Sequence, residues 1–217
     1  MKAALAYARL GWAVIPLHHV LADGACSCGS PKCTSQGKHP RFSSWPTDAT
    51  TDAEQIDAWW AKNPEANVGI ATGAKSGVFA VDLDGERGAD WWARFEAQHG
   101  PVHTTTAITG SGGRHLIFRM PAHGIRNSAK SIAPGVDVRG DGGQIVGAPS
   151  RSAKGPYRWA PGLDPWKTPP AEAPVQLLAL LNTAPKARPA EDTRGYYPPA
   201  SAEVLDAVRE EIGRAHV

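Results

Sequence analysis

The segment Val78–Gly85 constrains this chain most, because it has the pattern of an apolar strand that ends in two carboxylates. Side chains alternate between the two faces of a strand, so Asp82 and Asp84 are predicted to share one face while Val81 and Leu83 point into a core. Two like charges side by side repel each other unless a cation, a shared proton or a basic partner lies between them. Asp-x-Asp pairs also occur by chance in solvated turns, so the rest of the chain must decide between a site and a turn.

The size of the chain favours one main domain. Its 217 residues, of which 41% are hydrophobic, can bury one sizeable core and carry a small appendage. The net charge of +2 gives no sign of a nucleic-acid partner, but residues 119–158 carry seven Lys or Arg against two Asp. That local excess of positive charge favours a phosphate-bearing partner.

No segment predicts export or membrane insertion. The N-terminus starts with an alanine-rich amphipathic stretch that lacks a long apolar run and a cleavage site. No run approaches the roughly 20 apolar residues that a membrane-spanning helix needs. We therefore expect a soluble, cytoplasmic protein that has no membrane partner.

Three cysteines crowd into a short glycine-containing loop, residues 24–40, and a histidine follows them. Three closely spaced cysteines make a poor disulfide framework, whereas three thiolates and one imidazole can close a tetrahedral zinc site. The predicted ligands are Cys26, Cys28, Cys33 and His39. His18 and His19 are rivals for the fourth position, and free surface thiols are the alternative to a metal site. A closed four-ligand site would be structural, since no coordination position stays open for water.

Two tryptophan-rich helices are predicted on either side of the Asp82 strand. A capping-box pattern at Thr51–Glu54 predicts the start of the first helix, and Gly100 is expected to end the second. The pairs Trp59–Trp60 and Trp91–Trp92 lie at helical spacing from other apolar residues. This spacing predicts that the indole rings pack in the core rather than stack on bases.

A second strand with one polar face follows a glycine-rich loop. Residues 104–109 favour a strand, Gly110–Gly113 form the loop, and residues 114–118 form the next strand. Leu116 and Phe118 share one face of this strand and His115 takes the other. A lone histidine on a strand is usually structural. Backbone N–H groups in a neighbouring glycine loop can, however, cradle phosphate oxygens while an imidazole reaches one more.

Residues Gly135–Val146 are predicted to form a hairpin that turns at Gly140–Gly143. The valines of its first strand would face the core, so Asp137 and Arg139 would share the opposite face. An ion pair on a solvated sheet face is the plain alternative. Placed in one sheet, the three strands would gather on a single surface the residues Asp82, Asp84, His115, Asp137 and Arg139.

The C-terminal part is expected to lie outside the main domain, which we assign to residues 1–183. Residues 184–200 are rich in proline and mixed charges and suit a linker. Ser201 can cap an amphipathic helix over residues 201–217, which we expect to begin a following domain.

Converging carboxylates point to a particular chemistry. They bind hard cations such as Mg²⁺ or Mn²⁺ better than soft ones. Two such ions can drive nucleotidyl transfer, in which one activates a 3′-hydroxyl and the other holds the triphosphate. A histidine and an arginine beside them would neutralise phosphate charge.

Three segments, in this order and spacing, resemble the motifs of one family. They are Val81–Asp84, Ser111–Phe118 and Gly135–Gly143. Together they resemble the three motifs of the bifunctional DNA primase/polymerase (prim-pol) N-terminal domain, found in phage and plasmid replication proteins of the archaeo-eukaryotic primase superfamily. The resemblance implies an α+β fold with a primase-type core. In that core a mainly antiparallel sheet, similar to the RNA-recognition motif, is flanked by helices.

The resemblance also implies an activity, the synthesis and extension of primers on single-stranded DNA from NTPs or dNTPs. It assigns Asp82, Asp84 and Asp137 to the catalytic Mg²⁺ or Mn²⁺ ions. It assigns His115 to the phosphates of the incoming nucleotide, with Ser111 and Arg139 as further nucleotide contacts. The cysteine loop is similar to a zinc-binding insert that only some members carry. A helicase domain often follows in this family, and we expect one in the full-length protein.

Two other functions fit parts of the chain. Phe79–Gly85 also resembles the first motif of haloacid-dehalogenase-type phosphatases, in which the first aspartate is the nucleophile and the second a general acid. That family wants threonine or valine in the place of Glu86 and an acidic pair after a later parallel strand, which we cannot place here. A non-catalytic zinc-bearing DNA-binding module is the other alternative, but it leaves unexplained why three acids would face a phosphate partner without a metal.

Overall fold

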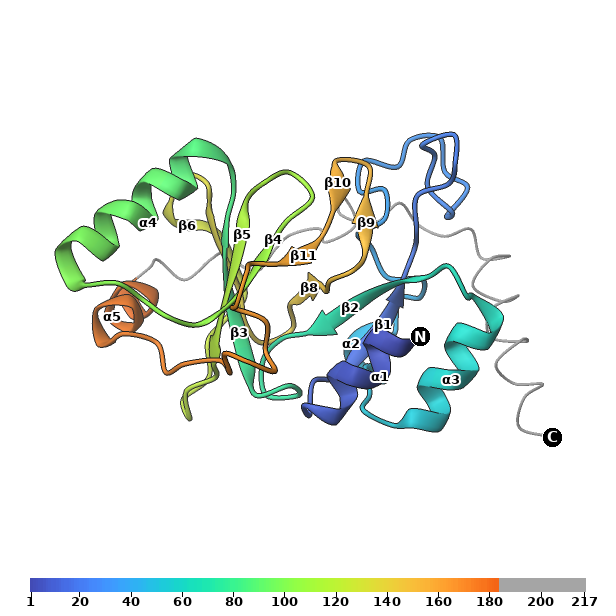
Figure 1. Ribbon diagram of the computed structural model, residues 1–217, viewed down its shortest axis with the longest axis horizontal. Helices are drawn as coiled ribbons and strands as arrows, with labels where there is room; N and C mark the ends of the chain where they lie inside the picture. The colour runs from blue at the N-terminus through green and yellow to red at the C-terminus, as the bar shows by residue number, and fades with distance from the viewer. Residues whose placement is uncertain (184–217) are drawn as a thin grey trace.

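The computed structural model describes residues 1–183, and these form two main antiparallel sheets with helices packed at both ends (Figure 1). The predicted linker at 184–200 and helix at 201–217 lie outside the described residues. The helices are α1 (Lys2–Arg9), α2 (Trp45–Asp48), α3 (Ala53–Lys62), α4 (Gly85–His99) and α5 (Val175–Thr183).

Strands β1 (Val14–Leu17), β2 (Asn67–Ala71) and β8 (Gln144–Val146) form a three-stranded sheet in the order β1-β2-β8. A six-stranded sheet has the order β11-β4-β5-β3-β7-β6. Its members are β3 (Val78–Leu83), β4 (Thr105–Ile108), β5 (Arg114–Arg119), β6 (Ser128–Ala133), β7 (Val136–Arg139) and β11 (Arg158–Trp159). The short strands β9 (Arg151–Ser152) and β10 (Gly155–Pro156) pair only with each other. Every pairing between named strands is antiparallel, which confirms the predicted fold class.

Strand β3 lies at the centre of the six-stranded sheet, between β5 and β7. One face of these three strands is apolar and packs against α4 and α5. Trp92 and Phe95 of α4 and Leu177 of α5 join a cluster with the sheet residues Phe79, Val81, Leu83, Leu116, Phe118, Val136 and Val138. The tryptophan at position 92 is therefore a core residue, as its helical spacing predicts.

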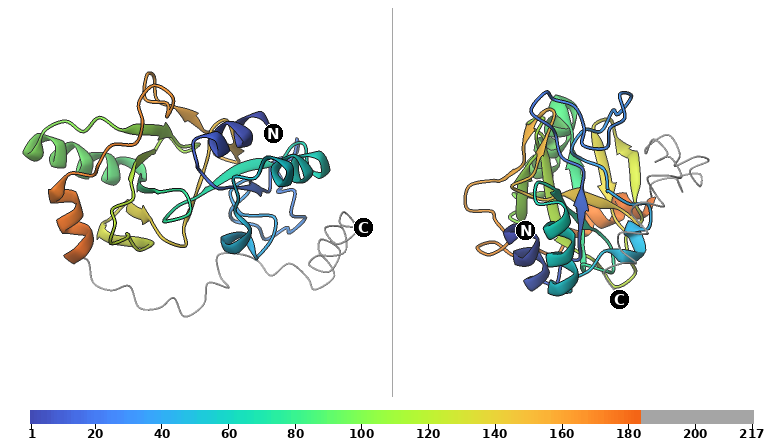
Figure 2. Two further views of the ribbon diagram at one scale, coloured as in Figure 1. Left: turned by 90° about the horizontal axis from the view of Figure 1, so that it is seen from below. Right: turned by 90° about the vertical axis from the view of Figure 1, so that its right-hand side faces the viewer.

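The opposite face of β3 and β5 is divided between a core and a polar region. Val78, Ala80 and Ile117 pack against α1, α3 and the three-stranded sheet, together with Trp59 and Trp60. Asp82 and His115 lie further along the same face, beyond this core. Figures 1 and 2 show α4 and α5 at one end of the molecule and α1 and α3 at the other, with β3 and β5 between them.

Two local predictions were wrong. Residues 135–146 do not form a hairpin, because β7 pairs with β3 and β6 whereas β8 pairs with β2 of the other sheet. The segment Gly140–Gly143 instead carries the chain between the sheets, and Thr72 donates a 2.7 Å hydrogen bond to the Gly140 carbonyl. Helix α3 is capped by Asp52, whose side chain accepts from the N–H groups of Glu54 and Gln55, rather than by the predicted Thr51 box.

No helix among residues 1–183 is long and apolar enough to span a bilayer.

Candidate active site and zinc-binding loop

Three neighbouring strands place three of the predicted site residues side by side. On β3, Asp82 pairs with His115 of β5 on one side and with Asp137 of β7 on the other. Directly opposite residues of an antiparallel pair project from the same face of the sheet. The alternation of apolar and polar residues in the sequence therefore becomes one polar row across the centre of the sheet.

Arg139 closes this row from the next position on the same face of β7. Its Nη2 atom is 2.9 Å from Oδ2 of Asp137 and 3.5 Å from Oδ2 of Asp82. Nε2 of His115 is 3.4 Å from the other oxygen of Asp82. The guanidinium of Arg139 thus bridges the two carboxylates, and the imidazole of His115 contacts Asp82 from the other side.

The environment of Asp82 favours its charged form. Only 8% of the residue is exposed, and this burial by itself would raise its pKa. The neighbouring His115 and Arg139 outweigh burial, and the pKa of Asp82 falls below its ordinary value. Asp82 is therefore an ionised carboxylate at neutral pH.

Asp84 lies beyond the end of β3, which stops at Leu83, and precedes α4. The prediction that it belongs to the strand was wrong, yet it remains close to the polar row. Partial burial of its carboxyl, followed by the charges of Asp82 and Asp137, raises the pKa of Asp84, while His115 and Lys38 oppose this shift. The third carboxylate is therefore repelled by the first two.

Gly135 holds Asp84 in place at the turn between β6 and β7. Its carbonyl accepts a 2.8 Å hydrogen bond from the Asp84 N–H. Gly135 has φ +80°, and a Cβ atom there would lie 2.6 Å from the Asp84 carbonyl oxygen. Only glycine allows this close approach without strain.

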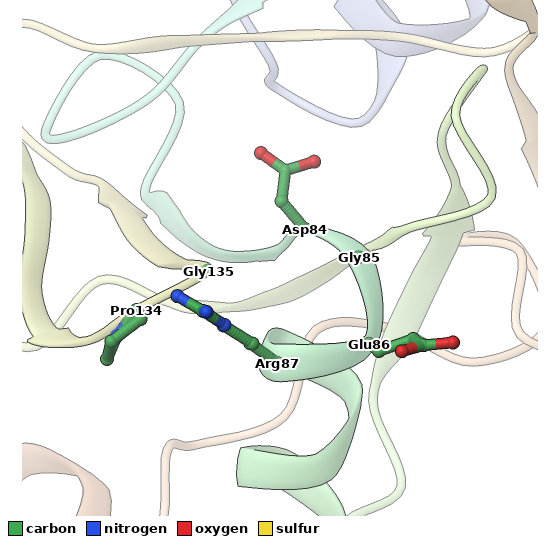
Figure 3. Close-up of a pocket in the computed structure, with 6 residues that line it drawn as sticks. All are labelled: Asp84, Gly85, Glu86, Arg87, Pro134 and Gly135. Atoms are coloured by element: carbon green, nitrogen blue, oxygen red, sulfur yellow. The ribbon is translucent and has the colours of Figure 1, made fainter.

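A pocket of about 500 Å³ opens beside Asp84, lined also by Gly85, Glu86, Arg87, Pro134 and Gly135. Figure 3 shows the Asp84 carboxylate directed away from the side chains of Glu86 and Arg87. Asp82, Asp137 and His115 do not line this pocket. It therefore adjoins the polar row at one residue and does not contain it.

His115 is almost fully buried, at 5% exposure. Its Nε2 atom faces Asp82, and Nδ1 is buried without a hydrogen-bond partner. The ring of Tyr157 lies 5.9 Å from the imidazole, centroid to centroid. A phosphate that contacts this histidine would have to compete with Asp82 for Nε2 or shift the ring to reach Nδ1.

Ser111 stands apart from the row, in the exposed loop between β4 and β5. Its hydroxyl is 3.1 Å from that of Thr109. The same loop lies close to the end of β3 at Gly113, where a Cβ atom would be 2.4 Å from the Leu83 carbonyl oxygen. The structure thus brings the loop to the end of the strand that carries Asp82, but no contact links Ser111 with the carboxylates.

The cysteine loop folds into a compact cluster. One ligand atom from each of Cys26, Cys28, Cys33 and His39 lies within 4.8 Å of the others. Nε2 of His39 is 3.3 Å from the Cys26 sulfur and 3.5 Å from the Cys33 sulfur. Ligands of a tetrahedral zinc ion are about 3.5 Å apart, given Zn–S and Zn–N bonds of about 2.3 and 2.0 Å. The cluster can therefore hold a zinc ion.

The rival histidines do not belong to this cluster. The ring of His18 packs on that of His39, with centroids 4.5 Å apart, and its Nδ1 is 3.0 Å from the Ser27 hydroxyl.

Burial lowers the pKa of His39, so its imidazole is neutral and able to bind a metal. Burial also raises the pKa of Cys33 to about 12, with the Cys26 thiol adding to the shift. The Cys33 thiol therefore resists ionisation, and a bound cation would offset that resistance.

Asn67 connects the cysteine loop to the rest of the molecule. Its side-chain Nδ2 donates to the carbonyls of Gly37 and Arg151 at 2.8 and 2.6 Å, and its Oδ1 accepts from the Arg151 N–H. The loop therefore lies against the β9–β10 hairpin, as Figure 1 also shows.

One family model matches most of the chain. The model of the N-terminal domain of bifunctional DNA primase/polymerase matches residues 4–176. The chain belongs to this family. Among curated proteins, none matches the chain.

Membership of the prim-pol family supports nucleotidyl transfer of the primase/polymerase type, with DNA and nucleotides as substrates. The phosphatase alternative needed an acidic pair after a parallel strand. The named strands of residues 1–183 contain no parallel pairing, and Asp137 lies on an antiparallel strand.

Two residues near the site were missed by sequence reasoning. Tyr157 packs beside His115, and Lys38 acts on the charge of Asp84. Both come from segments far from the three motifs. A lysine between a glycine and a predicted zinc ligand gave no periodic signal, because its effect on the pKa of Asp84 depends on the packing of segments that are far apart in the chain.

Proposed function

We propose that this chain is a DNA-dependent primase/polymerase that makes and extends primers on single-stranded DNA during phage or plasmid replication. Two Mg²⁺ or Mn²⁺ ions would be held by Asp82, Asp84 and Asp137. When bound, such ions supply activation of the primer 3′-hydroxyl and neutralisation of the triphosphate and leaving pyrophosphate. The catalytic domain would comprise residues 1–183.

The placement of two carboxylates opposite each other on β3 and β7, with a third at the end of β3, carries this proposal. The raised pKa of Asp84 supports it. Burial first, and then repulsion by Asp82 and Asp137, raises this pKa, and a bound cation would offset both by stabilising the charged carboxylate. Arg139 neutralises part of this charge by contacting both Asp82 and Asp137. In the loaded site it would be released in part to contact nucleotide phosphate.

His115 and Ser111 would act on the incoming nucleotide. The imidazole lies beside Asp82 and can turn toward a phosphate once a cation replaces it as the partner of that carboxylate. The exposed hydroxyl of Ser111 lies in the glycine loop at the end of β3, where backbone N–H groups can cradle phosphate oxygens. The Cys26–His39 loop would bind structural zinc.

Primer synthesis on unprimed template is the direct test. The purified chain is incubated with single-stranded DNA, labelled nucleotides and Mg²⁺ or Mn²⁺, and the products are resolved by length. We expect short oligomers from the wild type and none from Asp84→Asn, which keeps the shape of the side chain. Glu86→Gln is the matched control, because this neighbouring acid lies on the first turn of α4 and its side chain is directed away from Asp84 (Figure 3).

If the chain extends a supplied primer but makes no product on unprimed DNA, the proposal would hold for polymerase activity and fail for primer initiation. Equal synthesis by the wild type and Asp84→Asn would refute the metal site.

A further inference from the structure

Arg87 is the basic side chain of the pocket that opens beside Asp84. It lies in the first turn of α4 and is exposed to solvent. Within residues 1–183 its guanidinium forms no hydrogen bond and no ion pair. By contrast, Arg119 and Arg139 each contact a carboxylate. The fold therefore leaves the charge of Arg87 available for an anionic ligand in this pocket.

The side chain of Arg87 is directed toward the turn between β6 and β7. Figure 3 shows the guanidinium pointing toward Pro134 and Gly135, whereas the Glu86 side chain extends away from them. A Cβ atom at Gly135 would lie 3.4 Å from the Cβ atom of Arg87 and 2.6 Å from the Asp84 carbonyl oxygen. The absence of a side chain at Gly135 therefore lets this turn lie close to both the arginine and the aspartate.

Two loops meet the end of β3 from opposite sides. Gly113, in the loop before β5, would place a Cβ atom 2.4 Å from the Leu83 carbonyl oxygen. Gly135, in the turn before β7, accepts a 2.8 Å hydrogen bond from the N–H of the next residue of that strand end, Asp84. Because β3 lies between β5 and β7, the glycine-rich loop and the pocket flank this strand end on its two sides.

This arrangement matches the geometry of an in-line displacement. In nucleotidyl transfer the attacking 3′-hydroxyl and the leaving pyrophosphate lie on opposite sides of the reacting phosphorus. The proposed function places the triphosphate at His115 and Ser111, on the β5 side of the carboxylates. The strand that carries the attacking hydroxyl then approaches from the β7 side, where Arg87 lies.

We propose that Arg87 binds a backbone phosphate of the primer strand, at one of the last three linkages before the 3′ end, and so positions the 3′-hydroxyl. The inference rests on the proposed function, since it assigns the second substrate of the same site. A guanidinium suits this contact because its planar fork donates two hydrogen bonds to one phosphate group. The pocket, of about 500 Å³, has the volume of sites that hold small ligands.

Binding of a primer–template duplex, measured by fluorescence anisotropy with Ca²⁺ and without nucleotide, tests this contact in the absence of turnover. Arg87→Gln and Arg87→Lys are compared with Arg9→Gln, a matched control that removes an exposed arginine of α1 at the other end of the molecule (Figure 1). Loss of one charge-assisted contact should raise the Kd about 10-fold in Arg87→Gln and make binding less dependent on salt. Arg87→Lys should recover part of this loss, and Arg9→Gln should bind as the wild type does.

A neutral methylphosphonate linkage identifies the phosphate that Arg87 contacts. It is placed in turn at each of the last three linkages of the primer. At one of them it should weaken binding by the wild type about 10-fold and cause no further loss in Arg87→Gln, because the same contact is already missing. Independent losses at all three linkages would overturn the inference.

Primer extension separates this inference from the proposed function. Arg87→Gln should raise the KM for the primer–template about 10-fold and leave the KM for the nucleotide within about twofold. A raised KM for the nucleotide with unchanged primer binding would overturn the inference, since Arg87 would then contact the triphosphate. Equal extension by the wild type and Arg87→Gln, with both KM values unchanged, would overturn it and leave the proposed function standing. If the wild type makes no DNA but Arg87 and one linkage are coupled in binding, the proposed function fails and this inference stands.

Discussion

Asp82 and His115 lie directly opposite each other on adjacent antiparallel strands, with Oδ1 of the carboxylate 3.4 Å from Nε2 of the imidazole. Together with Arg139, this contact lowers the pKa of Asp82 although burial alone would raise it. The same side chains that would serve the nucleotide thus also stabilise a buried charge of the fold. Asp84 differs from Asp82 in this respect, because its pKa is raised rather than lowered.

Neutralising the two aspartates should affect stability in opposite directions. Asp82→Asn removes a buried charged acceptor from His115 and Arg139, so we expect a loss of about 1–3 kcal/mol in the free energy of unfolding. Asp84→Asn removes a charge that partial burial and repulsion by Asp82 and Asp137 disfavour, so we expect a gain of up to about 0.5 kcal/mol after solvent screening. Urea unfolding of both variants measures the two changes. Equal destabilisation would contradict the electrostatic difference between the sites.

Stability should depend on pH through both groups, again with opposite signs. The folded-state pKa of Asp82 is lowered, so its contribution is present above about pH 4, the unfolded value, and is lost as pH falls through the folded value. The folded-state pKa of Asp84 is raised, so its carboxylate costs stability at neutral pH and protonation removes that cost as pH falls. Unfolding of Asp84→Asn between pH 4 and pH 7, compared with the wild type, isolates the second effect. The difference between the two proteins should shrink toward pH 4.

Catalytic activity should fail in acid earlier than an ordinary carboxylate would require. Metal binding needs a deprotonated Asp84, and the raised pKa keeps this carboxyl protonated up to a higher pH than an ordinary aspartate. Because the metal and the proton compete for this carboxyl, raising the Mg²⁺ concentration should move the acidic limb of the rate profile to lower pH. Primer extension measured across pH at two Mg²⁺ concentrations tests this expectation. If the acidic limb does not move with the Mg²⁺ concentration, the loss of activity in acid would come from a group other than Asp84.

Removal of the fourth zinc ligand should release the metal, while removal of its neighbour should not. His39→Asn breaks the cluster, whereas His18→Asn removes a ring that packs on His39 and contacts the Ser27 hydroxyl but lies outside the cluster. We expect His39→Asn to lose zinc and at least about 2 kcal/mol of stability, or about 4–8 °C in Tm for a domain of this size. Metal analysis and thermal unfolding measure both quantities. Zinc retained by His39→Asn but lost by His18→Asn would show that His18, and not His39, is the fourth ligand.

Substitution of Gly135 should disturb Asp84 directly. Gly135→Ala would place a Cβ atom 2.6 Å from the Asp84 carbonyl oxygen at a residue with φ +80°. Gly142→Ala is the matched control, because Gly142 has φ +74° but a Cβ atom there would meet nothing within 4 Å. The control should lose about 1 kcal/mol from backbone strain, and Gly135→Ala should lose about 1–3 kcal/mol more together with most activity. Equal losses in the two variants would mean that the close approach to Asp84 is unimportant.

Local pattern predicted much of the candidate site. Alternation of apolar and polar residues predicted the strands that carry Asp82, His115 and Asp137, because each strand has one face in a core. The spacing of the cysteines predicted their cluster, since ligands close in sequence can meet around an ion without help from distant segments. The spacing did not decide which histidine is the fourth ligand, because His18, His19 and His39 are all close to the cysteines along the chain.

The local sequence pattern did not predict which strands pair with each other. The glycines after Arg139 indicated a turn, and a return strand beside β7 was the simplest partner for residues 144–146. The chain instead crosses to the second sheet, where β8 pairs with β2. Periodicity identifies a strand and its buried face, but the identity of its neighbour depends on the packing of the whole domain.

The sequence by itself determined the polar faces of three strands, the core helices with their tryptophans and the candidate metal-binding cluster, because these depend on side-chain alternation and short spacing. Tertiary structure alone decided that β3 lies between β5 and β7, which sets His115 and Asp137 on either side of Asp82. It also decided that the ring of Tyr157 packs beside His115. Contacts of this kind join residues that are far apart in the chain, so no local pattern encodes them.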